Sequence, residues 1–389
     1  MLNIAISDFN YPLPDEKVAL HPCAERSNSK LLVWNKGIIS ENIFSNISDY
    51  LPQNALLVFN DTRVVPARLV FHNATGARIE IFCLEPHSPK EITTAYSEKR
   101  EVTFVCLIGN KKKWKNGALK ILLPNDTLLT AELVGEYSND SFLVKFSWNN
   151  NKLTFSEVLE LAGKIPLPPY INRETEQEDK QRYQTIYARY NGSVAAPTAG
   201  LHFTQEMLQK LPQEKAYLTL HVGAGTFKPV KTDNISEHLM HAESLSISKE
   251  FLQQIKQALE QNRPIIPVGT TSMRTLESLY YLAVCNTNEI TQWMPYTTKS
   301  NLKPFEAIDN LLKDLRNLEA LSASTSLMIA PSYKFHFASG IITNFHQPKS
   351  TLLLLIAAML GNDWKRVYNY ALQNNFRFLS YGDSNLYLM

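Results

Sequence analysis

Residues 265–277 read IIPVGTTSMRTLE and contain the strand-to-helix transition that indicates the fold class. An apolar run of strand length leads into Gly269, and Thr270 or Thr271 then caps a helix. This helix carries Arg274 in its first turns. Strands and helices alternate in the same way elsewhere in the chain, which predicts an α/β domain with a partly parallel sheet.

Segments on both sides continue this alternation. Apolar runs of strand length occupy residues 30–34 and 55–59, and the second ends in Asn60, Asp61 and Thr62. A buried strand that ends in polar residues commonly delivers them to a site. Helices are expected near 15–19, at 155–162 with Gly163 as a left-handed stop, from Thr204 to about 211, from Ser248 to about 259, at 352–360 and at 363–374 before a strand-like tail.

Residues from about Pro66 to Trp148 have a different pattern. Short runs rich in Val, Ile, Leu and Phe are separated by turn signals, and helical periodicity is absent. We therefore predict an α/β main domain, residues 1–65 and 150–389, with an inserted small all-β, barrel-like domain, residues 66–149. Within the insertion, KKKWK at 111–115 can grip RNA, but we prefer to read it as a solvated hairpin loop.

Length and composition bound the class of protein. The chain has 389 residues, 44% of them hydrophobic, and a formal net charge of +2, so it can bury the cores of two domains, and RNA binding would need a local basic patch. The four cysteines lack metal-ligand spacing, so we expect no disulfide framework and no metal. A signal peptide and a membrane-length apolar run are both missing from the sequence. We expect a soluble, cytoplasmic monomer.

Glycines and polar side chains interrupt the patterned segments in one region of the chain. The sequence has only 14 glycines, yet five of them lie between Gly192 and Gly269. Such clustering indicates close approach of the backbone to a ligand, with ordinary turns as the alternative. The small side chains of residues 193–204 (SVAAPTAGLHFT) leave room for a flat or bulky ligand against the backbone, and residues 218–230 (LTLHVGAGTFKPV) suit a backbone loop around a nucleoside.

Three more polar stretches suggest chemistry. Residues 238–243 (HLMHAE) offer a general base rather than a metal site, although each histidine can equally make a structural hydrogen bond. The helix start after Gly269 suits a carboxylate or a phosphate, because free N–H groups, hydroxyls and a guanidinium favour anions. Residues 343–351 (TNFHQPKST) and 376–383 (FRFLSYGD) add further polar clusters.

Taken together, these stretches resemble the S-adenosylmethionine:tRNA ribosyltransferase-isomerase family of the queuosine pathway. Matching strings occur in the family's order and cover nearly the whole chain except the insertion and one later segment. They are YPLP, HPCAER, SKLLV, LVFNDTRVVPARL, GKIPLPPYI, YQTIYARYNGSVAAPTAGLHFT, LTLHVGAGTFKPV, HLMHAE, VGTTSMRTLES, TNFHQPKSTLLLL and FRFLSYGD. Each string alone is modest, and the combination is specific.

The resemblance implies a cytoplasmic enzyme that transfers and isomerises the ribosyl moiety of S-adenosylmethionine. The acceptor would be 7-aminomethyl-7-deazaguanine at the tRNA wobble position, and the products epoxyqueuosine-tRNA, methionine and adenine. S-adenosylmethionine would be a substrate, with no bound cofactor, and tRNA the other partner.

The implied chemistry needs a base to remove a ribose proton beside the sulfonium, and a group to assist departure of adenine. The catalytic candidates are His202, His221, His241, Glu243 and Asp61, and the sequence does not decide which is the base. Asp383 is a further candidate for assisting adenine. Expected substrate-binding residues are Asn60, Thr62, Arg63, Thr198, Gly200, Gly223, Gly225, Thr226, Gly269, Thr270, Thr271, Arg274, Asn344, His346, Ser350, Arg377, Tyr381 and Asp383.

The sequence also departs from the family pattern. Gln347 stands where the family usually has Leu, Ser332 where it has Gly, and Ser339 where it has Asp. The segment 285–327 is longer than usual and partly helical in pattern. Two alternatives therefore stay open: a paralogue that uses S-adenosylmethionine on another acceptor, and a non-catalytic RNA-binding protein.

Overall fold

Strand β3 (Leu56–Asn60) lies inside the main sheet and is apolar on both faces. Leu56 and Val58 belong to one hydrophobic core, whereas Leu57 and Phe59 belong to another. A strand that is covered on both faces reads as a continuous apolar run, which is why it could be recognised from sequence. The computed structural model describes residues 3–115, 117–138, 140–223, 230, 232–316 and 318–389.

The main sheet has the strand order β15-β3-β13-β14-β17-β16. Strand β3 pairs in parallel with β13 and with β15, whereas β14 runs antiparallel to both β13 and β17. This arrangement confirms the prediction of a mixed α/β fold with a partly parallel sheet. The additional strands are β13 (Glu214–Leu220), β14 (Glu243–Ser248), β15 (Ile265–Pro267), β16 (Glu289–Ile290) and β17 (Ala320–Thr325).

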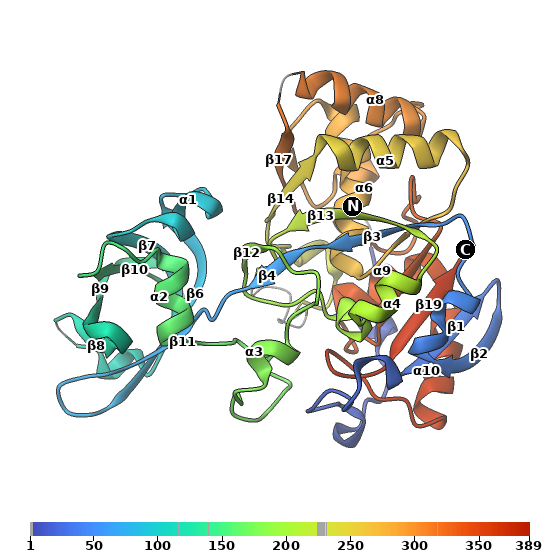
Figure 1. Ribbon diagram of the computed structural model, residues 1–389. Helices are drawn as coiled ribbons and strands as arrows, with labels where there is room; N and C mark the ends of the chain where they lie inside the picture. Colours follow the sequence, from blue (N-terminus) through green and yellow to red (C-terminus); the bar gives the residue numbers. More distant parts are fainter. Residues whose placement is uncertain (1–2, 116, 139, 224–229, 231, 317) are drawn as a thin grey trace.

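Helices α5 (Lys249–Glu260), α6 (Thr270–Cys285) and α8 (Pro304–Leu315) pack together on this sheet (Figure 1). Ser248 caps α5 as predicted, accepting a hydrogen bond from the Phe251 N–H. The predicted cap of α6 is wrong: its N-cap is Gly269, and Thr270 and Thr271 are the first helical residues. The turn from β15 into α6 has φ +91° at this position, a conformation that glycine adopts without strain.

A second sheet joins the two ends of the chain in the order β18-β19-β1-β2. The carboxy-terminal strand β19 lies between β18 and β1. It pairs in parallel with β1, beside which it is seen in Figure 1. The tail is therefore tied into the fold. Its elements are β1 (Lys30–Asn35), β2 (Ile38–Ile43), β18 (Gly340–Asn344), β19 (Ser384–Leu388) and the helices α9 (Thr351–Leu360) and α10 (Asp363–Gln373).

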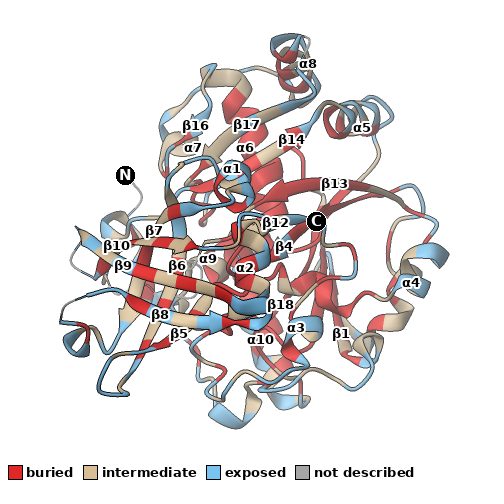
Figure 2. Cartoon of the chain, turned by 60° about the vertical axis from the view of Figure 1, so that its left-hand side comes forward, coloured by how far each residue is buried: buried red, intermediate tan, exposed pale blue. Residues whose placement is uncertain are grey.

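A seven-stranded antiparallel sheet lies to one side of this body (Figures 1 and 2). It has its own hydrophobic core, which includes Phe104, Phe146 and Phe155. Its strands are β5 (Arg68–His72), β6 (Arg78–Ser88), β7 (Glu101–Gly109), β8 (Leu119–Leu123), β9 (Thr127–Ser138), β10 (Ser141–Trp148) and β11 (Gly163–Lys164). Helices α1 (Ile92–Ser97) and α2 (Phe155–Ala162) pack against the sheet.

Two local predictions about this sheet need correction. Helix α1 forms where no helical pattern was recognised, because Glu91 caps it and Ala95 and Tyr96 are buried in the core of the sheet. Gly163 does end α2, but its φ of −94° is not left-handed. Glycine is needed there because a Cβ would lie 1.8 Å from the Pro66 carbonyl oxygen.

Shorter elements complete the chain. In the described residues, no helix is long and apolar enough to cross a membrane. The segment predicted as a helix near 15–19 forms a 3-10 helix, η2 (Asp15–Lys17). The others are β4 (Thr62–Val64), β12 (Tyr190–Ser193), α3 (Asp179–Arg182), α4 (Gln205–Lys210), α7 (Met294–Thr297) and the 3-10 helices η1 (Ile6–Phe9), η3 (Arg26–Asn28), η4 (Phe44–Asp49), η5 (Lys111–Lys113), η6 (Pro124–Asp126), η7 (Thr198–His202) and η9 (Ile235–Glu237).

Candidate functional site

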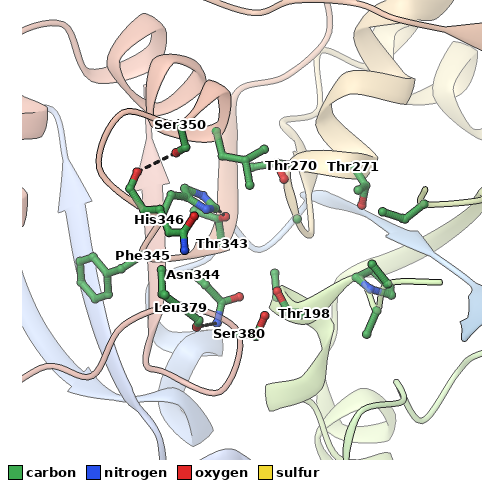
Figure 3. A pocket seen from close by; sticks show the side chains of 18 of the residues that line it. Thr198, Thr270, Thr271, Thr343, Asn344, Phe345, His346, Ser350, Leu379 and Ser380 are labelled. Carbon is green, nitrogen blue, oxygen red and sulfur yellow. Dashed lines mark hydrogen bonds between the residues drawn. The ribbon is translucent and has the colours of Figure 1, made fainter. Parts of the chain in front are cut away.

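Three loops meet where β15 and β18 end and enclose a cavity, here called the central pocket (Figure 3). The first loop precedes and includes η7, the second begins α6, and the third connects β18 to α9. These loops are far apart in sequence, so only the tertiary fold joins them. The predicted residues that line this pocket are Thr198, Gly269, Thr270, Thr271, Asn344, His346 and Ser350.

Two buried polar atoms of the central pocket have no hydrogen-bond partner among the described residues. They are the Thr271 hydroxyl oxygen Oγ1 and the Asn344 carboxamide oxygen Oδ1. Leaving a buried polar atom unsatisfied costs about 1–3 kcal/mol. Unsatisfied atoms that line a cavity are therefore natural contacts for a polar ligand.

The start of α6 also faces this pocket. Within the described residues, no side chain caps α6, so the first N–H groups of the helix stay available to an anion. Helix α9, on the other side, is closed by Ser350, whose hydroxyl accepts from the Leu353 N–H. The central pocket thus has one open helix start and one closed one.

His346 lies in the wall of the central pocket and is buried. Its Nε2 atom is 3.0 Å from the Thr343 hydroxyl oxygen. Burial alone lowers the pKa of His346 to about 3, so the ring is neutral near pH 7.

His202 lies behind the central pocket and lines a smaller one together with Arg377 and Tyr381. Its Nδ1 atom is 2.8 Å from the Ser29 hydroxyl oxygen, and its Nε2 atom is 3.2 Å from the amide nitrogen of Asn344. Burial lowers the pKa of His202 to about 3, with Arg377 and Arg26 adding to the shift. Both ring nitrogens are therefore occupied by the protein.

A second hollow, here called the large cleft, lies between the seven-stranded sheet and the main body and offers about 840 Å³ of space. Four predicted residues line it: His221, Gly223, His241 and Glu243. The His221 Nδ1 atom is 3.1 Å from the Thr62 hydroxyl oxygen, and burial lowers the pKa of His221 to about 4. His241 is exposed, whereas Glu243 is buried.

Arg274 and Glu243 form a buried ion pair. The Arg274 Nε atom also donates to the Leu327 carbonyl oxygen, and Glu243 accepts from the Gly223 N–H. Arg274 was expected to hold an anionic ligand, and the structure places its guanidinium against a carboxylate of the protein instead. It thereby connects α6 to the strand β14 that borders the large cleft.

The polar residues at the end of β3 contact the neighbouring strand β13 rather than a cavity wall. Asn60 exchanges two hydrogen bonds with the Leu220 backbone, and the Thr219 hydroxyl donates to Asp61. Burial raises the pKa of Asp61, against the opposing effect of the Thr219 hydrogen bond. Arg63 is exposed.

The polar cluster near the carboxy terminus holds two loops in place. Asp383 is buried and accepts from the Lys30 and Arg377 backbone N–H groups, and Tyr381 donates to Asp179. These contacts tie residues 376–383 to the body of the fold.

The remaining predicted residues have separate outcomes. A Cβ on Gly200 would lie 1.9 Å from the Tyr187 hydroxyl oxygen, so glycine is needed there for packing. Gly225 and Thr226 lie outside the described residues. Trp114 is buried and donates to the Gly117 carbonyl oxygen, so its ring is not free to stack on a base. The described part of the chain holds no cluster of His, Cys, Asp and Glu that could bind a metal.

Sequence reasoning missed several residues that line the hollows. Tyr170, Thr343 and Ser380 line the central pocket, and Arg68 and Lys90 line the large cleft. Thr343 and Ser380 lay inside strings already recognised as polar clusters, so proximity to Asn344 and Tyr381 was the available signal. Arg68 in β5 and Lys90 in the loop between β6 and α1 carried no local signal, because they reach the cleft only through the tertiary arrangement.

Fold and site together define an α/β protein with two adjoining hollows that share Val222. A family model described as "Queuosine biosynthesis protein" matches residues 6–387, and the chain belongs to this family. It is 37% identical over 391 residues to the S-adenosylmethionine:tRNA ribosyltransferase-isomerase of Halothermothrix orenii, covering 98% of this chain and 99% of that protein. The resemblance predicted from the motifs is therefore confirmed.

Two further relatives are similar along their whole length. The S-adenosylmethionine:tRNA ribosyltransferase-isomerase of Trichlorobacter lovleyi is 35% identical over 388 residues, covering 98% of this chain and 99% of that protein. The crystal structure of S-adenosylmethionine tRNA ribosyltransferase from Thermotoga maritima is 27% identical and matches with a TM-score of 0.48, covering 98% of this chain and 100% of that chain.

Proposed function

We infer that this protein transfers and isomerises the ribosyl moiety of S-adenosylmethionine onto 7-aminomethyl-7-deazaguanine at the tRNA wobble position. The products are epoxyqueuosine-tRNA, methionine and adenine. The observation that carries this function is 37% identity to a ribosyltransferase-isomerase across 98% of the chain. The protein is thus a transferase with S-adenosylmethionine and tRNA as its substrates.

We propose that each substrate occupies one of the two hollows. The central pocket and the large cleft share Val222, so ligands in the two can reach one another. The central pocket, with about 80 Å³ of space, is lined by small residues and threonine hydroxyls together with larger side chains such as Tyr170 and Phe345, and we assign S-adenosylmethionine to it. The large cleft has room for a nucleotide that projects from an RNA loop.

We propose that the start of α6 holds the methionine carboxylate. An uncapped helix start attracts an anion through its free N–H groups and the helix dipole. Thr270 and Thr271 lie there with their side chains at the pocket (Figure 3). Arg274 then acts from the second turn by holding Glu243 rather than by binding the ligand.

We propose His221 as the group that removes the ribose proton beside the sulfonium. It borders the large cleft next to the shared residue Val222, and its ring is neutral near pH 7 and can accept a proton. Glu243 is engaged by Arg274, and Asp61 by Thr219, which leaves both less suited to the task. His241 is exposed at the cleft and is the alternative.

We propose that residues 66–149 form an inserted domain with the role of a cleft wall. Its sheet has a separate core, to which Phe155 and Val158 of α2 also contribute. Phe82, Pro86 and Leu107 of this sheet line the large cleft. We also propose that the protein acts in the cytoplasm, where its tRNA substrate is found, and as a monomer, since one chain supplies both hollows.

The experiment that tests the function uses the purified chain, S-adenosylmethionine and tRNA that carries the aminomethyl-deazaguanine base. Adenine release together with epoxyqueuosine, identified by nucleoside mass, is the expected result. Adenine without the modified nucleoside would indicate a different acceptor, and no adenine from folded protein that binds S-adenosylmethionine would overturn the assignment.

The family departures do not favour another acceptor. Gln347 lines the central pocket, which is the donor side of this proposal. Ser332 occupies a turn at φ +82°, and the Ser339 N–H bonds to the Ile265 carbonyl oxygen. These two positions therefore have backbone roles.

A further inference from the structure

The Asn344 side chain is held in one orientation by two acceptors. Its amide nitrogen Nδ2 is 3.2 Å from the His202 Nε2 atom and 3.2 Å from the Leu379 carbonyl oxygen. A carbonyl oxygen can only accept, so the NH₂ group must face Leu379 and the carboxamide cannot be flipped. Both N–H groups of Asn344 are therefore committed to the protein.

His202 is fixed in the tautomer that this arrangement needs. Since Asn344 donates to Nε2, that nitrogen carries no proton, and Nδ1 carries it and donates to the Ser29 hydroxyl 2.8 Å away. The ring also packs against Phe44, with 5.1 Å between ring centroids. The lowered pKa of His202, about 3, keeps the ring neutral.

The Asn344 carboxamide oxygen takes no part in these hydrogen bonds. It is buried, has no partner among the described residues and belongs to a residue of the central pocket wall. In Figure 3 the side chain of Asn344 faces the side of the pocket that carries Thr198. An oxygen whose neighbouring N–H groups are both committed can offer a ligand nothing but an acceptor.

We propose that Asn344 accepts a hydrogen bond from an amino group of S-adenosylmethionine, and that His202 is a positioning residue that aims this acceptor. The inference rests on the proposed function, because it assumes an adenosyl-sulfonium amino acid in the central pocket. That ligand has two amino groups, the adenine 6-amino group and the α-ammonium, and both can only donate. His202 thereby acts through Asn344 and not as the general base of the reaction.

The first test compares His202→Gln with His202→Leu. A glutamine oxygen can replace Nε2 as the acceptor for Asn344, whereas leucine fills similar space without an acceptor. We expect His202→Leu to raise the Kd and KM for S-adenosylmethionine about tenfold, the loss of one well-made hydrogen bond, and His202→Gln to stay within about threefold of the wild type. The kcat for adenine release stays within about twofold in both.

Matched controls are available on the surface. His72 in β5 is exposed, so His72→Gln and His72→Leu are expected to leave Kd, KM and kcat unchanged. Circular dichroism and thermal unfolding establish that each variant is folded. A fall in kcat of about a hundredfold or more in both His202 variants, with Kd unchanged, is the signature of a lost general base and would overturn the proposal.

The second test identifies the amino group with Asn344→Ala, measured by calorimetric titration. We expect this variant to bind S-adenosylmethionine about tenfold more weakly than the wild type, and unchanged binding would overturn the proposal. S-inosylmethionine, which has oxygen in place of the 6-amino group, then separates the two donors. If Asn344 contacts the 6-amino group, only the wild type discriminates against this analogue; if it contacts the α-ammonium, both proteins discriminate equally.

Failure of the proposed function has a different signature. Wild-type protein that binds S-adenosylmethionine but releases no adenine would contradict the reaction, while the Kd comparisons would still decide the role of Asn344. Normal turnover with unchanged Kd in Asn344→Ala would leave the reaction in place and remove the inference.

Discussion

Lowering the pH from 8 to 5 is expected to cost this protein about 2 kcal/mol of stability through His346 alone. The His346 ring is buried in the central pocket wall, and burial is the single cause that lowers its pKa from 6.5 to about 3. In the unfolded chain the ring titrates near 6.5. The folded state therefore excludes a proton that the unfolded state binds.

The direction and the size of the effect follow from this difference. The folded pKa is lowered, so the stabilisation is complete above about pH 6.5 and is lost as the pH falls toward 3. A pH of 5 lies about 1.5 units below the pKa of the unfolded ring, so the unfolded ring is protonated while the folded ring is still neutral. Each unit is worth about 1.4 kcal/mol, which gives about 2 kcal/mol at pH 5.

The assay is urea unfolding at pH 8 and pH 5, followed by tryptophan fluorescence, for the wild type and His346→Gln. Glutamine can keep a hydrogen bond to the Thr343 hydroxyl but does not titrate. The comparison isolates one ring, because the other titrating groups are common to both proteins. Stability that falls equally in the wild type and the variant between the two pH values would refute the reasoning.

Three other changes have clear expected outcomes. Glu277→Gln should destabilise the protein by about 2–3 kcal/mol in urea unfolding. The buried Glu277 carboxylate accepts four hydrogen bonds, from the backbone N–H groups of His336, Phe337 and Ala338 and from the Tyr333 hydroxyl, and an amide must turn an N–H group toward at least one of these donors. An unchanged unfolding midpoint would contradict this account. Gly163→Ala should lower the free energy of unfolding by about 3 kcal/mol, because its Cβ would lie 1.8 Å from a backbone oxygen. The control Gly135→Ala, whose Cβ has nothing within 4 Å, should be nearly neutral, and equal unfolding midpoints would show that the β11 backbone can move. Thr271→Val should weaken binding of S-adenosylmethionine about fivefold, because it removes a pocket hydroxyl without a protein partner in the described residues. Thr297 is exposed, so Thr297→Val serves as the control, and full affinity of Thr271→Val in calorimetry would place Thr271 away from the ligand.

Elements with a local signal were predicted well from the sequence. Strand β3 and helices α2, α5, α9 and α10 appear close to their expected positions, because apolar periodicity and capping residues lie within each segment. Helix α1 was missed because a short helix depends on tertiary packing, here of Tyr96 against Phe104 and Phe155. Gly163 was recognised as important, but the reason lies in the distant carbonyl of Pro66.

The sequence predicted which stretches supply candidate site residues, but it did not predict the role of each residue. Thr198, Thr271 and Asn344 were all selected from polar interruptions, and the fold brings them to one pocket. His202 and His221 looked equivalent in sequence, each a histidine two residues from a glycine. The structure separates them, because both ring nitrogens of His202 are bonded to protein groups whereas His221 borders the large cleft.

The end of β3 shows why a polar strand end is an ambiguous signal. Because β3 and β13 are parallel neighbours, their carboxyl ends meet, and polar groups on one strand can be satisfied by the other. Asn60 binds the Leu220 backbone, and Thr62 approaches His221, the residue that follows β13 and faces the large cleft. The polar side chains therefore fix the strand end that carries His221. Substituting Thr62 is thus expected to change the orientation of His221. We propose the same relation between His202 and Asn344.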